Sequence, residues 1–135
     1  MTIRELSRLY FLEKLIERDT ENLARLNACL QPGGMELDGM PRSPSHGNSL
    51  IEKAVIQISD IEERIRRQQR EYIRERVKIE DYINSVEDYQ IRLILLFRFV
   101  DLLTWQQVAQ RIGGNNTEDS VRKACNRYLK RSEKQ

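Results

Sequence analysis

Two stretches of this chain repeat apolar residues at every seventh position, and this spacing constrains the possible fold more than any other feature. The longer repeat comprises Ile51, Ile58, Ile65, Tyr72, Ile79 and Val86. The shorter repeat comprises Leu9, Ile16, Leu23 and Leu30, with Leu12 and Leu26 each three residues after a repeat position. Such spacing is typical of α-helices that pair along their length, as in a coiled coil. Because neither helix buries its apolar seam alone, the sequence predicts an all-α protein with a long antiparallel helical hairpin.

The two repeats are separated by a segment that does not favour helix. The stretch "QPGGMELDGMPRSPSHGN", residues 31–48, contains all three prolines of the chain. Proline restricts the residue before it, and glycine has a poor helix propensity. Ser49 and Glu52 have the spacing of a capping box, which marks the start of a helix. We therefore expect a heptad helix over residues 1–30, a linker over residues 31–48 and a long heptad helix over residues 49–86.

The long repeat is polar in its middle. A second row on the same side, three residues after the first row, has Gln68 and Glu75 at its centre. We expect residues 68–76 to lie beyond the end of the shorter partner helix. The same region contains the arginine-rich run "RIRRQQREYIRERVK". This run is either a nucleic-acid surface or, as we prefer, a solvated helix face on which the arginines pair with Glu71, Glu75 and Glu80.

Charge is distributed unevenly along the chain. The net charge is +2, but residues 104–135 contain seven Lys or Arg and three Asp or Glu, a surplus of +4. The first 103 residues contain 16 basic and 18 acidic side chains, a balance of −2. A polyanionic partner is therefore expected at the basic C-terminal part of the chain.

Cysteine content and hydropathy indicate a reducing, aqueous compartment. Cys29 and Cys125 lie far apart, and each follows an alanine in a helical stretch, so we expect buried thiols and no disulfide. The N-terminal stretch "MTIRELSRLYFLEKLIERD" carries charges throughout and does not have the pattern of a signal peptide. No apolar run approaches the length of a membrane span, about 20 residues. We expect a cytoplasmic protein with no membrane partner and no cofactor.

The C-terminal part has the pattern of three successive helices. The stretch "DYQIRLILLFRFVDLL", residues 88–103, is so apolar that it predicts the central helix of a small core. The stretch "TWQQ" then has the form of a capping box, with Thr104 as the cap and Gln107 as its partner. A short helix over residues 105–112 ends at two glycines, and Asn116 or Thr117 caps the last helix. The two short helices predict a helix-turn-helix domain over residues 87–135.

The predicted last helix has two different sides. Val121, Cys125 and Leu129 recur on the side that would face the core. The opposite side has a polar and cationic set, namely Ser120, Arg122, Lys123, Asn126, Arg127, Lys130 and Arg131. Arginine and asparagine make bidentate contacts with guanine and adenine, and lysine and arginine bind phosphates. We interpret this side as a surface that binds double-stranded DNA, in preference to a surface that serves packing alone.

Residues 91–131, "IRLILLFRFVDLLTWQQVAQRIGGNNTEDSVRKACNRYLKR", resemble region 4 of bacterial sigma factors. The shared features are an apolar helix with an arginine, the step "D-x-L-[ST]-W-x-x-[VI]-A", and the motifs "R-I-G" and "S-V-R-x-x-x-x-R-x-L". The whole chain is more weakly similar to small phage and prophage proteins grouped with ArpU- and RinA-type regulators of late genes. The resemblance implies base contacts by Ser120, Arg122, Lys123 and Asn126. It implies contacts nearer the DNA backbone by Thr104, Gln106 and Arg127.

The leading hypothesis is a sequence-specific, DNA-binding transcriptional regulator of phage type, acting in the cytoplasm of a bacterial host cell. RNA polymerase is a further candidate partner, and the heptad helices would serve homo-oligomerisation or partner docking. Two alternatives stay open: a small terminase-like protein that recognises DNA for packaging, and a helix-turn-helix that docks on protein or RNA. An enzyme is not expected, because His46 is the only histidine and lies in the linker, without partners for acid–base chemistry or zinc.

Overall fold

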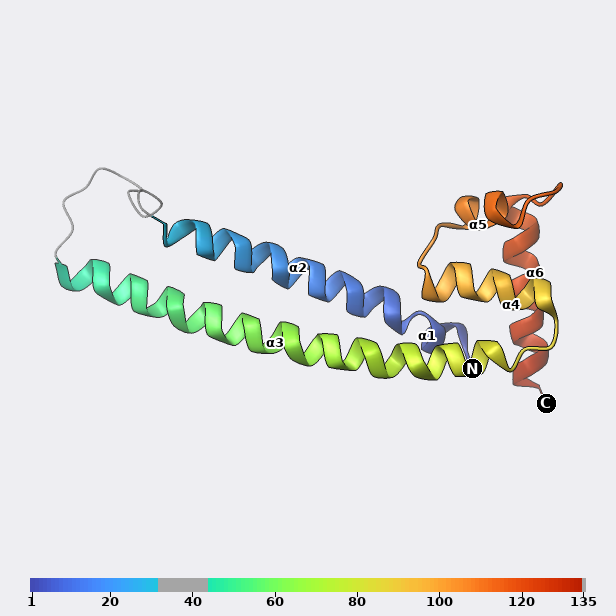
Figure 1. The fold of residues 1–135 in the computed structure, drawn as a ribbon, viewed down its shortest axis with the longest axis horizontal. Helices are drawn as coiled ribbons and strands as arrows, with labels where there is room; N and C mark the ends of the chain where they lie inside the picture. The colour runs from blue at the N-terminus through green and yellow to red at the C-terminus, as the bar shows by residue number, and fades with distance from the viewer. Residues whose placement is uncertain (32–43, 135) are drawn as a thin grey trace. The chain divides into compact units, whose positions relative to one another are not determined.

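The computed structural model describes residues 1–31 and 44–134, with only the backbone described over residues 44–48. Every element assigned in these ranges is a helix, so the predicted all-α class is confirmed (Figure 1). The helices are α1 (Ile3–Leu6), α2 (Arg8–Cys29), α3 (Pro44–Asn84), α4 (Tyr89–Leu95), the π-helical η1 (Leu96–Val100), α5 (Trp105–Ile112) and α6 (Glu118–Glu133). None of the described helices combines the length and the apolar character needed to cross a bilayer.

The chain forms two compact units. Unit 1 comprises Met1–Glu13 and Glu71–Gln135, and unit 2 comprises Lys14–Arg70. Helices α2 and α3 both contribute to each unit, because the boundary falls within them.

In unit 2, residues of α2 and α3 contact one another in reverse chain order. Asp19 lies against Arg64, and Leu26 lines the same groove as Gln57 and Ile61. Ala54 and Ile58 are buried, and most other residues of the two predicted seams in this unit are half-buried. The seven-residue spacing therefore identified the residues at the contact between α2 and α3 in this unit.

The seam of unit 2 contains a buried polar cluster where the repeat expects an apolar side chain. Asp19, midway between Leu12 and Leu26, is only 3% exposed. Arg64 donates from Nε and Nη2 to the two carboxylate oxygens of Asp19, over 2.9 and 2.8 Å. These hydrogen bonds hold the pKa of Asp19 below its ordinary value, against the opposing effect of desolvation, and the neighbouring Gln68 side chain lowers it further. A bidentate pair of this kind fixes which residues of α2 and α3 lie opposite one another.

The expectation that residues 68–76 lie beyond the end of the partner helix is wrong. Gln68 contacts Asp19, and Glu75 is 7% exposed and pairs with Arg8 of α2 over 3.6 Å. Helix α2 lies alongside more of α3 than its apolar repeat predicts, because polar residues of both helices continue the contact beyond the apolar ones. The interpretation of the arginine-rich run as an ion-paired helix face is consistent with the pairs Arg74–Glu71, Arg76–Glu80 and Lys78–Glu75.

Two predicted helix boundaries differ from those in the structure. Helix α3 begins at Pro44, so the start and the cap predicted at Ser49 are wrong, and residues 44–48 are not part of a linker. Proline fits the first position of a helix, because a backbone N–H at that position would have no acceptor within the helix and the φ of proline already has a helical value. The rest of the predicted linker, residues 32–43, lies outside the described residues. The first predicted helix is interrupted at Ser7, whose Oγ donates to the carbonyl of Ile3 over 2.7 Å.

Unit 1 has a single apolar core around α4 and η1. Ile94 and Leu95 are fully buried, and they belong to the same cluster as residues from every other helix of the unit. Those residues are Leu6, Leu9, Ile79, Ile83, Val108, Ala109, Val121, Cys125 and Leu129. Burial raises the pKa of the Cys125 thiol to about 11, so this cysteine acts as an apolar core residue. Cys29 is half-buried and also free.

The central helix ends differently from the prediction. A continuous helix over residues 88–103 was expected, but after Leu95 the chain forms the π-helical turn η1, which ends at Val100. The amide of Asp101 donates to the carbonyl of Leu96 over 2.9 Å, five residues back, as in a π-turn. Leu102 then has φ 59°, in the left-handed region that costs energy for a residue with a Cβ. This sharp turn separates the central helix from α5.

Arg98 stabilises the turn after η1. Its Nη1 donates to the carbonyl of Leu103 over 2.9 Å, and its guanidinium lies 4.7 Å from the centre of the Trp105 ring. Hydrogen bonding to the loop and stacking on the first residue of α5 both hold that helix close to η1.

Acid is expected to weaken the pairing of α2 with α3 through Asp19. Since the folded-state pKa of Asp19 is lowered, its contribution to stability is present above the ordinary carboxyl pKa, about 4, and is lost as the pH falls through the folded value. Asp19→Asn should therefore reduce the stability at pH 7 by about 1–3 kcal/mol and flatten the loss of stability toward pH 3. Urea unfolding at several pH values measures both effects. Glu21→Gln, which removes an exposed carboxylate of the same helix, is the control; an equal effect of the two substitutions would contradict the role of Asp19.

Candidate nucleic-acid interface

Helix α5 begins and ends as its local sequence predicts. Thr104 Oγ1 accepts a hydrogen bond from the amide of Gln107 over 3.2 Å, and Gln107 Oε1 accepts one from the amide of Thr104 over 2.9 Å. This is the predicted capping box. At the other end, Gly113 and Gly114 have φ 78° and 64°, and open space surrounds both, so the backbone conformation alone accounts for these two glycines.

Helix α6 begins with a second capping box. Thr117 is the cap, one of the two residues predicted for this role, and its Oγ1 accepts from the amide of Ser120 over 3.1 Å. The Ser120 hydroxyl accepts from the amide of Thr117 and donates to its carbonyl over 2.9 Å. Ser120 is exposed, and its hydroxyl proton is directed into this cap rather than outward.

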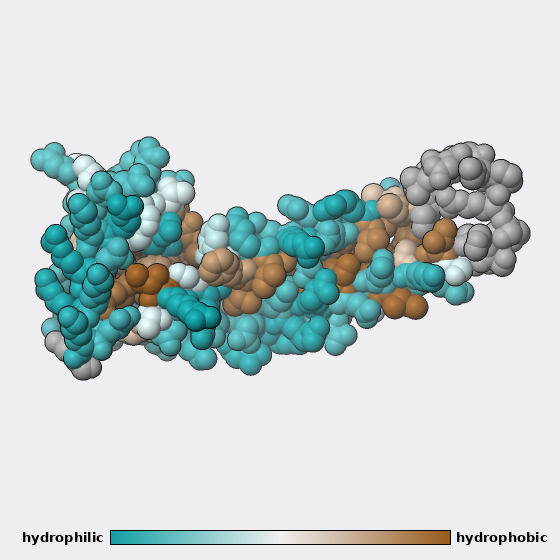
Figure 2. All heavy atoms as spheres, turned by 180° about the vertical axis from the view of Figure 1, so that it is seen from behind, coloured by the Kyte–Doolittle hydropathy of each residue, from teal (hydrophilic) through white to brown (hydrophobic). Residues whose placement is uncertain are grey.

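The two sides of α6 have contrasting environments. Val121, Cys125 and Leu129 are at most 1% exposed. The cations Arg122, Lys123, Arg127, Lys130 and Arg131 are all exposed, whereas Asn126 is half-buried. Figure 2 shows one face of the molecule, on which hydrophilic side chains cover most of the surface at the α6 end. The predicted division between a core side and a solvent side therefore agrees with the burial of these residues.

Residues on the solvent side of α6 form two adjacent rows at helical spacing. One row contains Asp119, Arg122, the half-buried Asn126 and Lys130, and the other contains Lys123, Arg127 and Arg131 and continues to Lys134, the C-cap of the helix. Lys123, Arg127 and Lys130 have no carboxylate partner among the described residues, whereas Arg122 pairs with Asp119 over 2.6 Å. The rows therefore present mainly uncompensated positive charge to solvent.

The remaining predicted contacts are at the start of α5. Thr104 and Gln106 are both exposed. The Thr104 oxygen is used as an acceptor in the cap, whereas no hydrogen bond of the Gln106 side chain is recorded in the described chain. Thus all eight predicted residues lie on α6 or at the start of α5, within unit 1.

Arg98 and Arg111 are further functional candidates that the residue pattern did not single out. Arg98 contacts Leu103 and Trp105 at the start of α5, and the Arg111 guanidinium lies 5.8 Å from the centre of the Phe97 ring. Both set the position of α5 relative to the central helix. For Arg98, the available sequence signal was an arginine within a largely apolar helix, followed by the only tryptophan of the chain.

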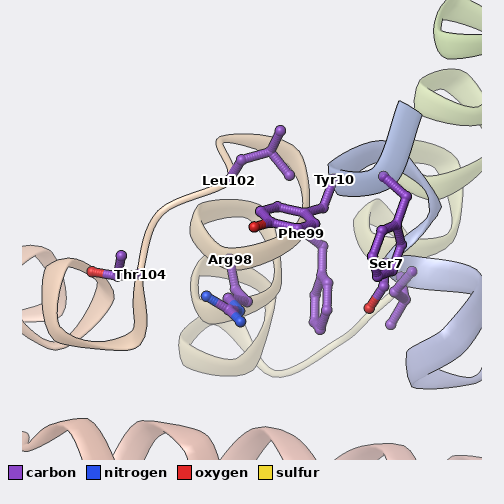
Figure 3. A pocket seen from close by; sticks show the side chains of 8 residues that line it. Ser7, Tyr10, Arg98, Phe99, Leu102 and Thr104 are labelled. Atoms are coloured by element: carbon purple, nitrogen blue, oxygen red, sulfur yellow. The ribbon is translucent and has the colours of Figure 1, made fainter. Parts of the chain in front are cut away.

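Unit 1 also has a cavity of about 390 Å³ beside η1 (Figure 3). Leu6, Ser7, Tyr10 and Phe11 line it from the N-terminal helices, and Arg98, Phe99, Leu102 and Thr104 line it from the other side. These two groups are far apart in the sequence, so no local pattern indicates the cavity. No cluster of three or more potential metal ligands occurs in the described ranges, and the side chain of His46 lies outside them.

Comparisons of this chain with protein-family models, with curated proteins and with solved structures gave no match.

Thr104→Ala is expected to lower the free energy of unfolding by about 1 kcal/mol, because the first turn of α5 loses its cap. Gln106→Ala, at a neighbouring exposed position that makes no recorded hydrogen bond, should leave the stability within about 0.5 kcal/mol of the unsubstituted protein. Thermal melting followed by circular dichroism compares the two. Equal melting temperatures for both variants would contradict the structural role of the Thr104 hydroxyl.

Proposed function

We propose that this protein binds duplex DNA through α6, with α5 and α6 acting as the two helices of a helix-turn-helix. The observation that carries this proposal is the pair of cationic rows on the exposed side of α6, opposite the buried Val121, Cys125 and Leu129. A helix of this kind, supported from behind by an apolar core, fits the width of the major groove. The basic surplus of residues 104–135 adds attraction to a polyanion.

The residues of α6 and α5 have distinct roles in this proposal. Arg122 and Asn126 contact base edges from one row, since their side chains offer the bidentate geometry for guanine and adenine. Lys123, Arg127 and Lys130 bind phosphates, and Lys123 and Ser120 are near enough to the N-terminal end of α6 to reach bases as well. Thr104 and Gln106 contact the backbone from the N-terminus of α5, where amide N–H groups favour anions.

The biological role that we propose is transcriptional regulation of phage or prophage type. It rests on the resemblance of residues 91–131 to sigma factor region 4. In this role the paired α2 and α3 hold two copies together or dock a partner. Recognition of DNA for packaging is the alternative within the same chemistry, and a ring-shaped oligomer in solution would favour it.

The arginine-rich face of α3 is a less favourable nucleic-acid surface. Half of its arginines are compensated: Arg64 is bound to the buried Asp19, and Arg74 and Arg76 pair with glutamates of their own helix. The other three, Arg66, Arg67 and Arg70, are exposed and form no ion pair within the described residues. Positive charge that is already neutralised attracts phosphates only weakly.

Binding of the full chain to random duplex DNA, measured at several salt concentrations, tests the proposal. Each phosphate contact adds about −0.9 to the slope of log K against log salt concentration. Lys123→Ala/Arg127→Ala should therefore make the slope about 1.8 units less steep. The matched control is Arg66→Ala/Arg67→Ala, which removes two exposed cations of α3. A less steep salt dependence in this control variant alone would assign the DNA-binding site to α3. A binding constant independent of salt would refute DNA binding.

A further inference from the structure

The pair formed by Arg122 and Asp119 is the one ion pair of α6 among the described residues. Arg122 Nη2 donates to Asp119 Oδ1 over 2.6 Å. The two residues are three positions apart, so they are neighbours on the exposed side of the helix. Asp119 lies in the first turn of α6, beside the residues that we propose contact DNA.

This ion pair contributes little to the stability of the fold. The side chains of Arg122 and Asp119 are 45% and 67% exposed, and ion pairs between solvated groups have small net effects. Its main physical effect is geometric, because the hydrogen bond restricts an arginine side chain that otherwise samples many rotamers.

The helix dipole does not distinguish Asp119 from Glu118. Glu118 and Asp119 are both in the first turn of α6, and both carboxylates interact favourably with the positive end of the helix. Glu118 forms no ion pair within the described residues, whereas Asp119 contacts Arg122. Both carboxylates repel phosphate, so neither residue would be expected in the first turn of α6 if only the affinity for DNA mattered.

We infer that Asp119 is a positioning residue that holds Arg122 in the orientation in which it reads guanine. This inference rests on the proposed DNA-binding function. A guanidinium has five N–H donors, and Asp119 uses one of them, on Nη2. Nη1 and the second hydrogen of Nη2 stay available for the two acceptors, O6 and N7, that guanine presents in the major groove. Because Arg122 is restricted before binding, it loses less conformational entropy when it contacts the base.

The experiment is a selection of bound sequences from a random duplex pool, followed by binding measurements on the selected site and on its three versions with another base at the guanine position. The full-length protein is expected to prefer guanine at one position, and Arg122→Ala should abolish that preference. Asp119→Ala should reduce the same preference by about fivefold or more while it strengthens binding to random duplex, because a charge that repels phosphate is removed. Asp119→Asn, which keeps an oxygen acceptor for Arg122, should retain part of the preference.

Glu118→Ala is the matched control, since it removes an equal charge from the same helical turn without removing a partner of Arg122. It should strengthen random binding to a similar extent and leave the guanine preference unchanged. In the Arg122→Ala background, Asp119→Ala should have no further effect on the base preference at that position.

Equal effects of Glu118→Ala and Asp119→Ala on the guanine preference would overturn the inference. A loss of selectivity caused by Asp119→Ala at a base position that does not depend on Arg122 would also overturn it. If the unsubstituted protein binds duplex without any guanine preference, the inference fails together with base reading by Arg122, and the proposed binding of duplex DNA through α6 stands. If it binds no duplex at all, the proposed function itself fails.

Discussion

Burial of the apolar helix formed by α4 and η1 is the constraint on which unit 1 depends. Ile94 and Leu95 are completely buried, which requires apolar partners on several sides of one short helix. Those partners come from both ends of the sequence: Leu6 and Leu9 near the N-terminus, and Val121, Cys125 and Leu129 in α6. Because α6 satisfies this requirement with one side only, its opposite side is free of any packing role. The filling of the core thus leaves that side of α6 available for a cationic surface.

Specific pairing of α2 with α3 comes from polar contacts as well as apolar ones. A repeat of leucine and isoleucine alone permits these helices to slide by a whole heptad, because each apolar position is equivalent to the next. Asp19 and Arg64 are not equivalent to any other pair, and a buried carboxylate that loses its partner is strongly unfavourable. The bidentate contact therefore excludes the shifted arrangements. In unit 1, the buried Glu75 of α3 lies 3.6 Å from Arg8 of α2, a single ion pair that favours the same arrangement more weakly.

Features that depend on neighbouring residues were predictable from the sequence, and features that depend on distant contacts were not. The caps at Thr104 and Thr117 were predicted correctly, since a capping box needs only four consecutive residues. Burial of Val121, Cys125 and Leu129 followed from helical spacing. The partner of Asp19 lies 45 residues away, and the turn after η1 is accompanied by contacts of Arg98 with the Leu103 carbonyl and the Trp105 ring that no helical spacing indicates, so neither was foreseen. The start of α3 at Pro44 was missed because proline was interpreted as a helix breaker, although it also fits a first helical position.

The charges on α6 are difficult to explain by stability alone. Lys123, Arg127 and Lys130 are within one or two helical turns of one another and have no carboxylate partner in the described chain, so their mutual repulsion opposes folding slightly. On α3, in contrast, Arg74, Arg76 and Lys78 are each compensated by a nearby glutamate. The chain thus neutralises Arg74, Arg76 and Lys78 of α3, whereas Lys123, Arg127 and Lys130 of α6, like Arg66, Arg67 and Arg70 elsewhere on α3, form no ion pair within the described residues. A partner with many negative charges removes that repulsion when it binds, and this gain is available only to a helix whose cations have no partner within the protein.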